Sequence, residues 1–309
     1  MRKRWASLVV LVVLIGGASV RAQDGAGGHL SDEQRALIDR VVQTNFEGYH
    51  SYHTESSGSE MQTVTVSLGN ASRTFIQTVM WSQSVDLVKV DGEKNIQAKV
   101  SATVSIPDAA DYTVNAEARL VDGVLYVKAA FAPPTPEQLT LPDGWVIVED
   151  PVHQDVYQYL QLDDLISGRS SLYDDAALPG TLVSDVTLEA RTLDDGTPVE
   201  AITLFFDRDG LVQSLRATPN DGAGTALADM MYDAVDSNSY AKTVLVVGPD
   251  NTPVQFEAAT VVETAAIDAR ALDSGHYPEG TQLAFVLDSS TSRTFSRIDE
   301  PLEPVSVPE

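Results

Sequence analysis

Apolar and polar residues alternate strictly between Tyr112 and Leu120. The apolar side consists of Tyr112, Val114, Ala116, Ala118 and Leu120. The pair Asp122-Gly123 follows, which suits the positive φ angles of a two-residue hairpin turn, and an apolar stretch from Val124 runs back. A strand of this kind buries one face and exposes the other. The pattern predicts a β-hairpin within an antiparallel sheet.

The same period of two recurs along most of the chain. Further strands are predicted at residues 61–68, 74–81, 85–90, 96–104, 144–148, 182–190, 199–206, 241–247, 254–262, 283–287 and 293–298. Turn residues separate several of them, at Gly69-Asn70, Asp91-Gly92 and Asp195-Gly196. A protein rich in antiparallel strands follows from this pattern.

Helical spacing appears near the start of the chain and in two later stretches. Ser31 and Gln34 form a capping-box pattern ahead of an apolar stripe that includes Leu37, Ile38 and Val41. A second helix is predicted at residues 226–231, and short helices around residues 156–166.

The first 22 residues have the features of a signal peptide. Arg2-Lys3-Arg4 precede an apolar segment from Leu8 to Ile15 that is too short to span a membrane, and cleavage is predicted before Gln23. An uncleaved anchor is the alternative. Either form places the protein outside the cytoplasm, secreted or associated with the cell envelope.

The rest of the chain divides into three parts by composition. Residues 23–30 are a flexible Gly-rich spacer, residues 31–298 form a β-rich domain, and residues 299–309 form an acidic, Pro-rich tail predicted to be disordered. A polar, Gly-rich stretch at 219–225 is a candidate internal boundary.

Composition excludes several classes of function. The chain of 309 residues has no cysteine, so disulfides, thiolate metal sites and cysteine nucleophiles are absent. Its net charge of −25 is unfavourable for nucleic acid and for anionic lipid headgroups. Solubility is the simplest reading of this charge.

No motif predicts catalysis, a cofactor or a metal. His50 and His53 are three residues apart, a spacing that points them to opposite faces of a strand. The segment from Asp207 to Gly210 resembles the start of a calcium loop but lacks the downstream glutamate, and it also suits an ordinary turn. The sequence therefore predicts a protein that is not an enzyme and has no cofactor and no metal site.

Small residues are concentrated on the apolar faces of two neighbouring strands. We predict that these faces line a ligand cavity, with lining residues Ala98, Val100, Ala102, Val114, Ala116, Ala118 and Leu120. The alternative is that helices pack closely against the alanines and fill this space.

Four segments carry a family resemblance. They are Val121 to Lys128, Leu141 to Val146 with its Gly144-Trp145, Asp163 to Ile166 and Asp195 to Val199. Together with the signal peptide, amphipathic helix and meander, they resemble the extracytoplasmic lipid-carrier superfamily that includes LolA, LppX and LprG. The resemblance extends from residue 31 to residue 206. The lipid-anchor cysteine of the LppX and LprG branch is absent, and the region after Gly224 is longer than that family requires.

The resemblance implies an α+β fold: a strongly curved antiparallel β-sheet, or half-barrel, with helices packed on its concave side. It also implies a carrier that holds the acyl chains of a lipid or acylated ligand between sheet and helices, without covalent chemistry. Its contact with a membrane would be transient or through an uncleaved signal segment. The alternative is a cell-surface or secreted binding or scaffold protein with a filled core and no small-molecule ligand.

Overall fold

A computed structural model describes residues 30–43, 49–107, 109–132, 144–147, 182–217, 232–272 and 277–308. The strands are β1 (Ser51–Leu68), β2 (Ala71–Val90), β3 (Glu93–Ser105), β4 (Tyr112–Val121), β5 (Val124–Ala132), β6 (Val146–Ile147), β7 (Asp185–Thr192), β8 (Pro198–Phe206), β9 (Tyr240–Val247), β10 (Pro253–Glu263), β11 (Ile267–Asp268) and β12 (Thr281–Ser296). The helices are α2 (Asp32–Gln43), α5 (Arg208–Ala217), α7 (Ala269–Leu272) and the 3₁₀ turn η4 (Pro249–Asn251). The signal segment, the helices predicted at 156–166 and 226–231 and the boundary at 219–225 lie outside the described residues.

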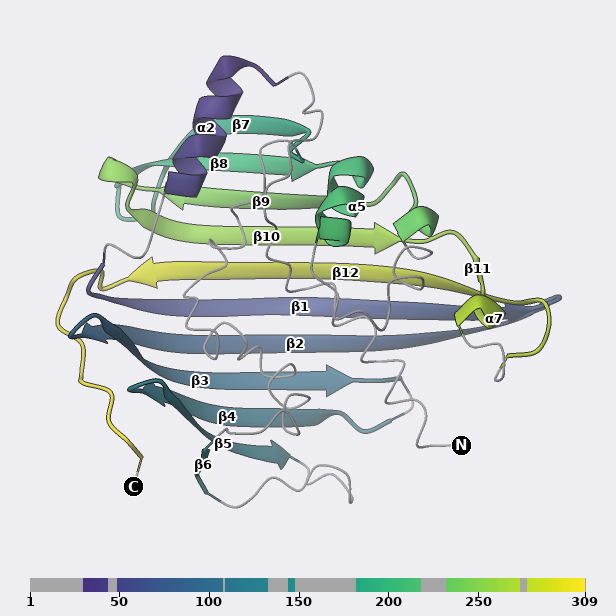
Figure 1. Ribbon diagram of the computed structural model, residues 1–309, viewed down its shortest axis with the longest axis horizontal. Coiled ribbons are helices and arrows are strands. Elements are labelled where there is room, and N and C mark those ends of the chain that lie inside the picture. Colours follow the sequence, from purple (N-terminus) through teal and green to yellow (C-terminus); the bar gives the residue numbers. More distant parts are fainter. Residues whose placement is uncertain are drawn as a thin grey trace.

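All the strands belong to one antiparallel sheet. Its order is β6-β5-β4-β3-β2-β1-β12-β10-β9-β8-β7, with β11 paired to β12 off this path (Figure 1). The last strand, β12, lies between β1 and β10 and joins two meanders into one surface. Strands that precede and follow residues 219–225 therefore share one sheet.

The three central strands are longer than the alternation predicts. The strands predicted at 74–81 and 85–90 form the single strand β2, and those at 283–287 and 293–298 fall largely within β12. Strand β1 begins at Ser51, ten residues earlier than predicted. The added segments are rich in serine and threonine, and neighbours on both sides supply their backbone hydrogen bonds.

The predicted hairpin turns are confirmed by their backbone angles. Asp91 and Gly92 have φ of 54° and 89°, and Asp122 and Gly123 have φ of 51° and 77°. Paired positive φ angles match the right-handed twist of the flanking strands, which explains the Asp-Gly sequence at both turns.

Helix α2 begins as its capping box predicts. The backbone N–H of Gln34 donates to Ser31 Oγ at 3.1 Å, and the N–H of Ser31 donates to Gln34 Oε1 at 3.0 Å. Helix α2 packs against β7 and β8, at one end of the sheet. No helix in the described part of the chain is long and apolar enough to cross a membrane.

Helix α5 was not predicted. The Asp-Arg-Asp-Gly segment that suggested a turn begins this helix, because Asp207 Oδ1 accepts a hydrogen bond from the N–H of Gly210 at 3.0 Å. Asp207 thus acts as the N-cap residue. Across the described ranges, no group of three or more histidines and carboxylates is placed to hold a metal ion.

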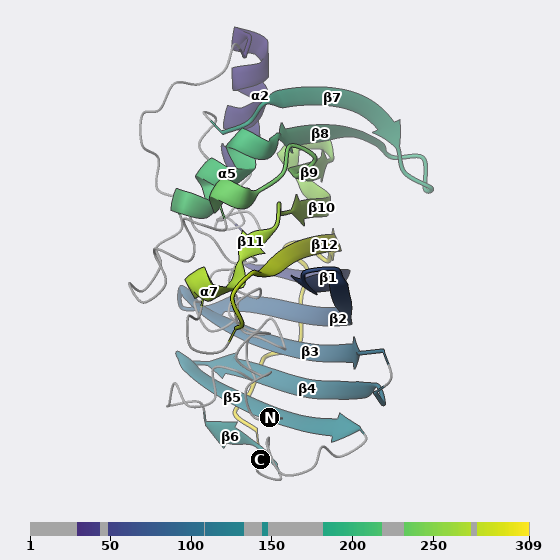
Figure 2. The same ribbon diagram turned by 90° about the vertical axis from the view of Figure 1, so that its right-hand side faces the viewer.

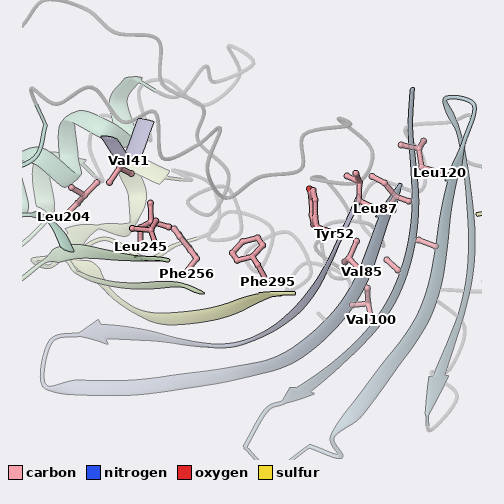
Figure 3. Close-up of a cluster of buried hydrophobic side chains, with 14 of the residues drawn as sticks. Val41, Tyr52, Val85, Leu87, Val100, Leu120, Leu204, Leu245, Phe256 and Phe295 are labelled. Atoms are coloured by element: carbon pink, nitrogen blue, oxygen red, sulfur yellow. The ribbon is translucent and has the colours of Figure 1, made fainter. Parts of the chain in front are cut away.

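The sheet is open and strongly curved, and its largest cluster of buried apolar side chains lies on the concave side. Figure 3 shows side chains from both ends of the sheet, among them Leu120, Tyr52, Phe295 and Leu204, pointing into the curve. We call this side the inner face and the opposite side the outer face. The β-rich, curved architecture agrees with the predicted half-barrel, and helical cover over the whole concave side remains a prediction.

The C-terminal residues, predicted to be disordered from residue 299, follow a defined path beside the sheet. The backbone N–H of Asp299 donates to the carbonyl of Ser51 at 2.8 Å. Further along, Arg119 Nη1 donates to the carbonyl of Ser306 at 3.0 Å, and Val305 is buried. The tail therefore crosses the ends of strands from β1 to β4 (Figure 1).

Candidate functional site

The seven residues predicted to line a cavity lie together on the inner face. Across β3 and β4, Ala98 pairs with Ala118, Val100 with Ala116 and Ala102 with Val114, and Leu120 lies opposite Ile96 in the same row. All seven are buried, with exposed fractions between 1% and 8%. The register thus brings the predicted residues into one continuous patch of small and aliphatic side chains.

This patch continues across the curve of the sheet. Tyr52 of β1 pairs with Leu87 of β2, and Leu87 pairs with Ile96 of β3. On the other side of the curve, the apolar surface continues through Phe295, Phe256, Leu245 and Leu204 to Val41 of α2, as Figure 3 shows. The inner face is one apolar surface that connects the two meanders.

A row of buried polar side chains interrupts the apolar surface near its centre. Gln83, Ser56 and Arg293 occupy matched positions on β2, β1 and β12. Arg293 is only 8% exposed, and its Nε donates to Ser56 Oγ at 2.9 Å. In the next strand, β10, the residue opposite Arg293 is Phe256. A buried cation with hydrogen-bonding neighbours thus lies directly beside apolar side chains.

The sequence alone does not predict this row, because its members come from distant parts of the chain. The inner positions after Tyr52 are Thr54, Ser56 and Gly58, which break the apolar alternation. Such a polar run at inward-facing positions is the signal that marks the row. It could be recognised only once β12 was known to lie beside β1.

A partly buried carboxyl lies further along β1. Burial raises the pKa of Glu60, and the donor Gln62 Nε2 partly offsets this effect by hydrogen bonding to the carboxylate. Glu60 lies between Val79 and Ser289 in the register. The inner face therefore carries a second polar position, toward the β1–β2 turn.

Two hollows lie mainly on the outer face. One has a volume of about 560 Å³ and lies over β2 to β5. Its walls include Val100 and Ala116, two of the predicted lining residues, together with the outward residues Lys99, Glu117 and Lys128. The other, of about 620 Å³, lies over the serine-rich centre of the sheet around Gly58. Both are bordered mostly by residues that alternate with the buried ones.

The two histidines considered as ligands are separated. His53 lies on the outer face, with Nδ1 2.8 Å from Asp86 Oδ1 and Nε2 2.9 Å from Glu55 Oε1. His50 instead donates its backbone N–H to Asp299 Oδ1. His53 is thus held between two carboxylate side chains at the surface.

Comparison with known proteins gives distant structural likenesses. No family model matches the chain, and no curated protein matches it. A DUF1329 family protein from Desulfovibrio piger is similar over 89% of this chain and 95% of its own, with 11% identity and a TM-score of 0.25. A domain assigned to outer membrane lipoprotein sorting, from Vibrio parahaemolyticus, is similar over 88% and 94%, with 10% identity and a TM-score of 0.22. At these TM-scores the likenesses carry no argument about function.

Proposed function

We propose that this protein is an exported carrier that binds acyl chains of a lipid or lipidated ligand against the inner face. The proposal is supported by one observation above the others: a curved, largely apolar surface extends across the sheet from β4 to β8, interrupted at its centre by the row of Gln83, Ser56 and Arg293. Apolar burial contributes about 25 cal/mol per Å², so a chain laid along this surface gains substantial affinity.

In this proposal helices on the concave side close the cavity. Ile38 and Val41 of α2 already belong to the same apolar cluster as the sheet, at its β7–β8 end. Movement of such helices would admit and release the ligand, and the transfer would involve no covalent step. The buried row of Gln83, Ser56 and Arg293 would meet the polar end of the ligand.

A filled core is the second candidate, and one observation favours it. The seven predicted lining residues are at most 8% exposed, a degree of burial typical of a packed interior. The protein would then be a binding or scaffold protein at the cell surface.

Mass spectrometry of an organic extract of the purified protein separates the two candidates. The carrier proposal predicts acyl lipids in an amount comparable to the protein. Extracts without lipid, from a protein that also fails to bind added fatty acid, would favour the filled core.

A further inference from the structure

Negative charge is distributed very unevenly along this chain. There are 45 aspartates and glutamates among 309 residues, yet none occurs from residue 61 to residue 85. At the average density of acidic residues along the chain, this stretch would hold about three or four of them. The adjoining segment of β12 from Thr281 to Leu287 also has none. Arg73 is the only charged residue in either segment.

These segments are neighbours in space. They form the β1–β2 turn, the strand segments leading to it and the adjacent part of β12. In Figure 1 this part of the sheet extends to the right well past the ends of β3, β4, β9 and β10. Figure 2 views the same projecting end from its tip. We call this end, residues 61–76 with Tyr277, the hairpin tip.

Apolar side chains are exposed on both faces of the hairpin tip. Leu68 is 45% exposed at an inner-face position, and Met61 and Ile76 are 40% and 38% exposed at outer-face positions. Isolated exposed apolar residues are ordinary, but several gathered on one projecting hairpin whose own residues include no carboxylate indicate an interaction surface.

A hollow of about 370 Å³ opens at the hairpin tip. Its walls are Val66, Leu68, Ala71, Ser72, Arg73, Phe75 and Tyr277. The guanidinium carbon of Arg73 lies 4.8 Å from the centre of the Phe75 ring, and Arg73 forms no ion pair with any residue that the structure describes. An exposed arginine above apolar side chains is suited to the boundary between lipid headgroups and hydrocarbon.

Several carboxylate residues in the described part of the chain border the tip: Glu60 precedes Met61, Asp288 lies opposite Met61, Asp268 lies opposite Gln282, and Glu279 lies near Leu68. Glu279 precedes Gly280, whose added Cβ would lie 4.0 Å from Leu68 Cδ1. The carboxylate oxygen Oε2 of Glu279 lies 3.9 Å from Nη1 of Arg270. The charge of Glu279 is therefore partly offset by a cation of the protein itself.

We infer that the hairpin tip docks onto the surface of a phospholipid membrane. Leu68 and its apolar neighbours enter the headgroup region, and Arg73 meets lipid phosphate. The strongly acidic remainder of the protein is repelled by anionic headgroups, so the region that approaches them must be free of carboxylates. This inference does not depend on a ligand at the inner face.

Vesicle flotation tests the inference with the purified full-length protein. The wild type should float with phosphatidylcholine vesicles at physiological salt. Leu68→Asp should reduce the bound fraction by about tenfold, and Arg73→Glu should weaken binding to vesicles that also contain phosphatidylglycerol. Val90→Asp is the matched control, because Val90 is 47% exposed at the opposite end of β2.

Site-specific labelling gives an independent readout, since the chain contains no cysteine. An environment-sensitive dye on Leu68→Cys should shift its emission to shorter wavelength when vesicles are added, whereas the same dye on Val90→Cys should not. Wild type that stays unbound, or equal binding by Leu68→Asp and Val90→Asp, would overturn the inference.

Discussion

At the scale of single residues, two positions on β1 show how the crowded inner face constrains side chains. Gly58 lies opposite Trp81, and a Cβ at residue 58 would be 2.6 Å from Trp81 Cε2 and 2.6 Å from the carbonyl oxygen of Ser290. Glu60, two residues later, keeps a carboxyl in a largely desolvated position. Neither role could be predicted from the sequence, since both depend on neighbours from β2 and β12.

Replacing Gly58 with alanine should destabilise the fold. The new methyl group would have to displace the Trp81 ring or the β12 backbone, and overpacking of this kind costs about 1–3 kcal/mol of unfolding free energy. Gly248→Ala is the control, because a Cβ there meets Val254 Cγ2 at an ordinary 3.5 Å. Equal denaturation midpoints for the two variants would show that Trp81 does not pack on Gly58.

Replacing Glu60 with glutamine should stabilise the protein more as the pH rises. Because burial raises the folded-state pKa of Glu60 above its unfolded value, the folded protein binds this proton more tightly. The ionised carboxylate of Glu60 therefore lowers the free energy of unfolding. This loss is absent below the unfolded-state pKa, where Glu60 is protonated in both states, and complete above the folded-state pKa. Thermal melting should therefore show a gain for Glu60→Gln at about pH 7.5 that shrinks toward about pH 4.

A gain for Glu60→Gln that is the same at every pH would contradict the assignment of a raised pKa.

At the scale of elements, turns and caps were predictable and strand lengths were not. Asp122-Gly123 and the Ser31–Gln34 box are local patterns with local causes, and both appear in the structure. The start of β1 and the middle of β12 contain serine-rich segments without apolar alternation. Pairing on both sides, rather than intrinsic preference, makes these segments strands.

The β4–β5 turn offers a test at this scale. Gly123 has a φ of 77° and open space around its Cβ position, so the penalty of a larger residue comes from the backbone alone. Gly123→Val should lower the unfolding free energy by about 1–3 kcal/mol. Gly123→Asn should cost less, because asparagine tolerates this conformation. Equal losses for both variants in a denaturant titration would argue against a backbone cause.

At the scale of the whole molecule, the strand order is the feature that the sequence did not reveal. Insertion of β12 between β1 and β10 depends on its pairing with β1, which joins residues more than two hundred positions apart in the chain. It creates the continuous inner face and brings Arg293 beside Ser56. The alanine-rich patch of β3 and β4 could be predicted because a hairpin register is local, whereas the polar row could not.

The Ala116→Phe variant is the sharpest test of acyl-chain binding at the inner face. Ala130→Phe is the matched control, since Ala130 lies exposed on the outer face of the neighbouring strand β5, opposite Asn115. Binding of a fluorescent fatty acid and thermal stability would be measured for the wild type and both variants. If acyl chains bind at the inner face, the wild type and Ala130→Phe bind the fatty acid, and Ala116→Phe stays folded and loses binding. A wild type that does not bind, together with a loss of about 1–3 kcal/mol of stability in Ala116→Phe, would contradict such binding and indicate a filled core.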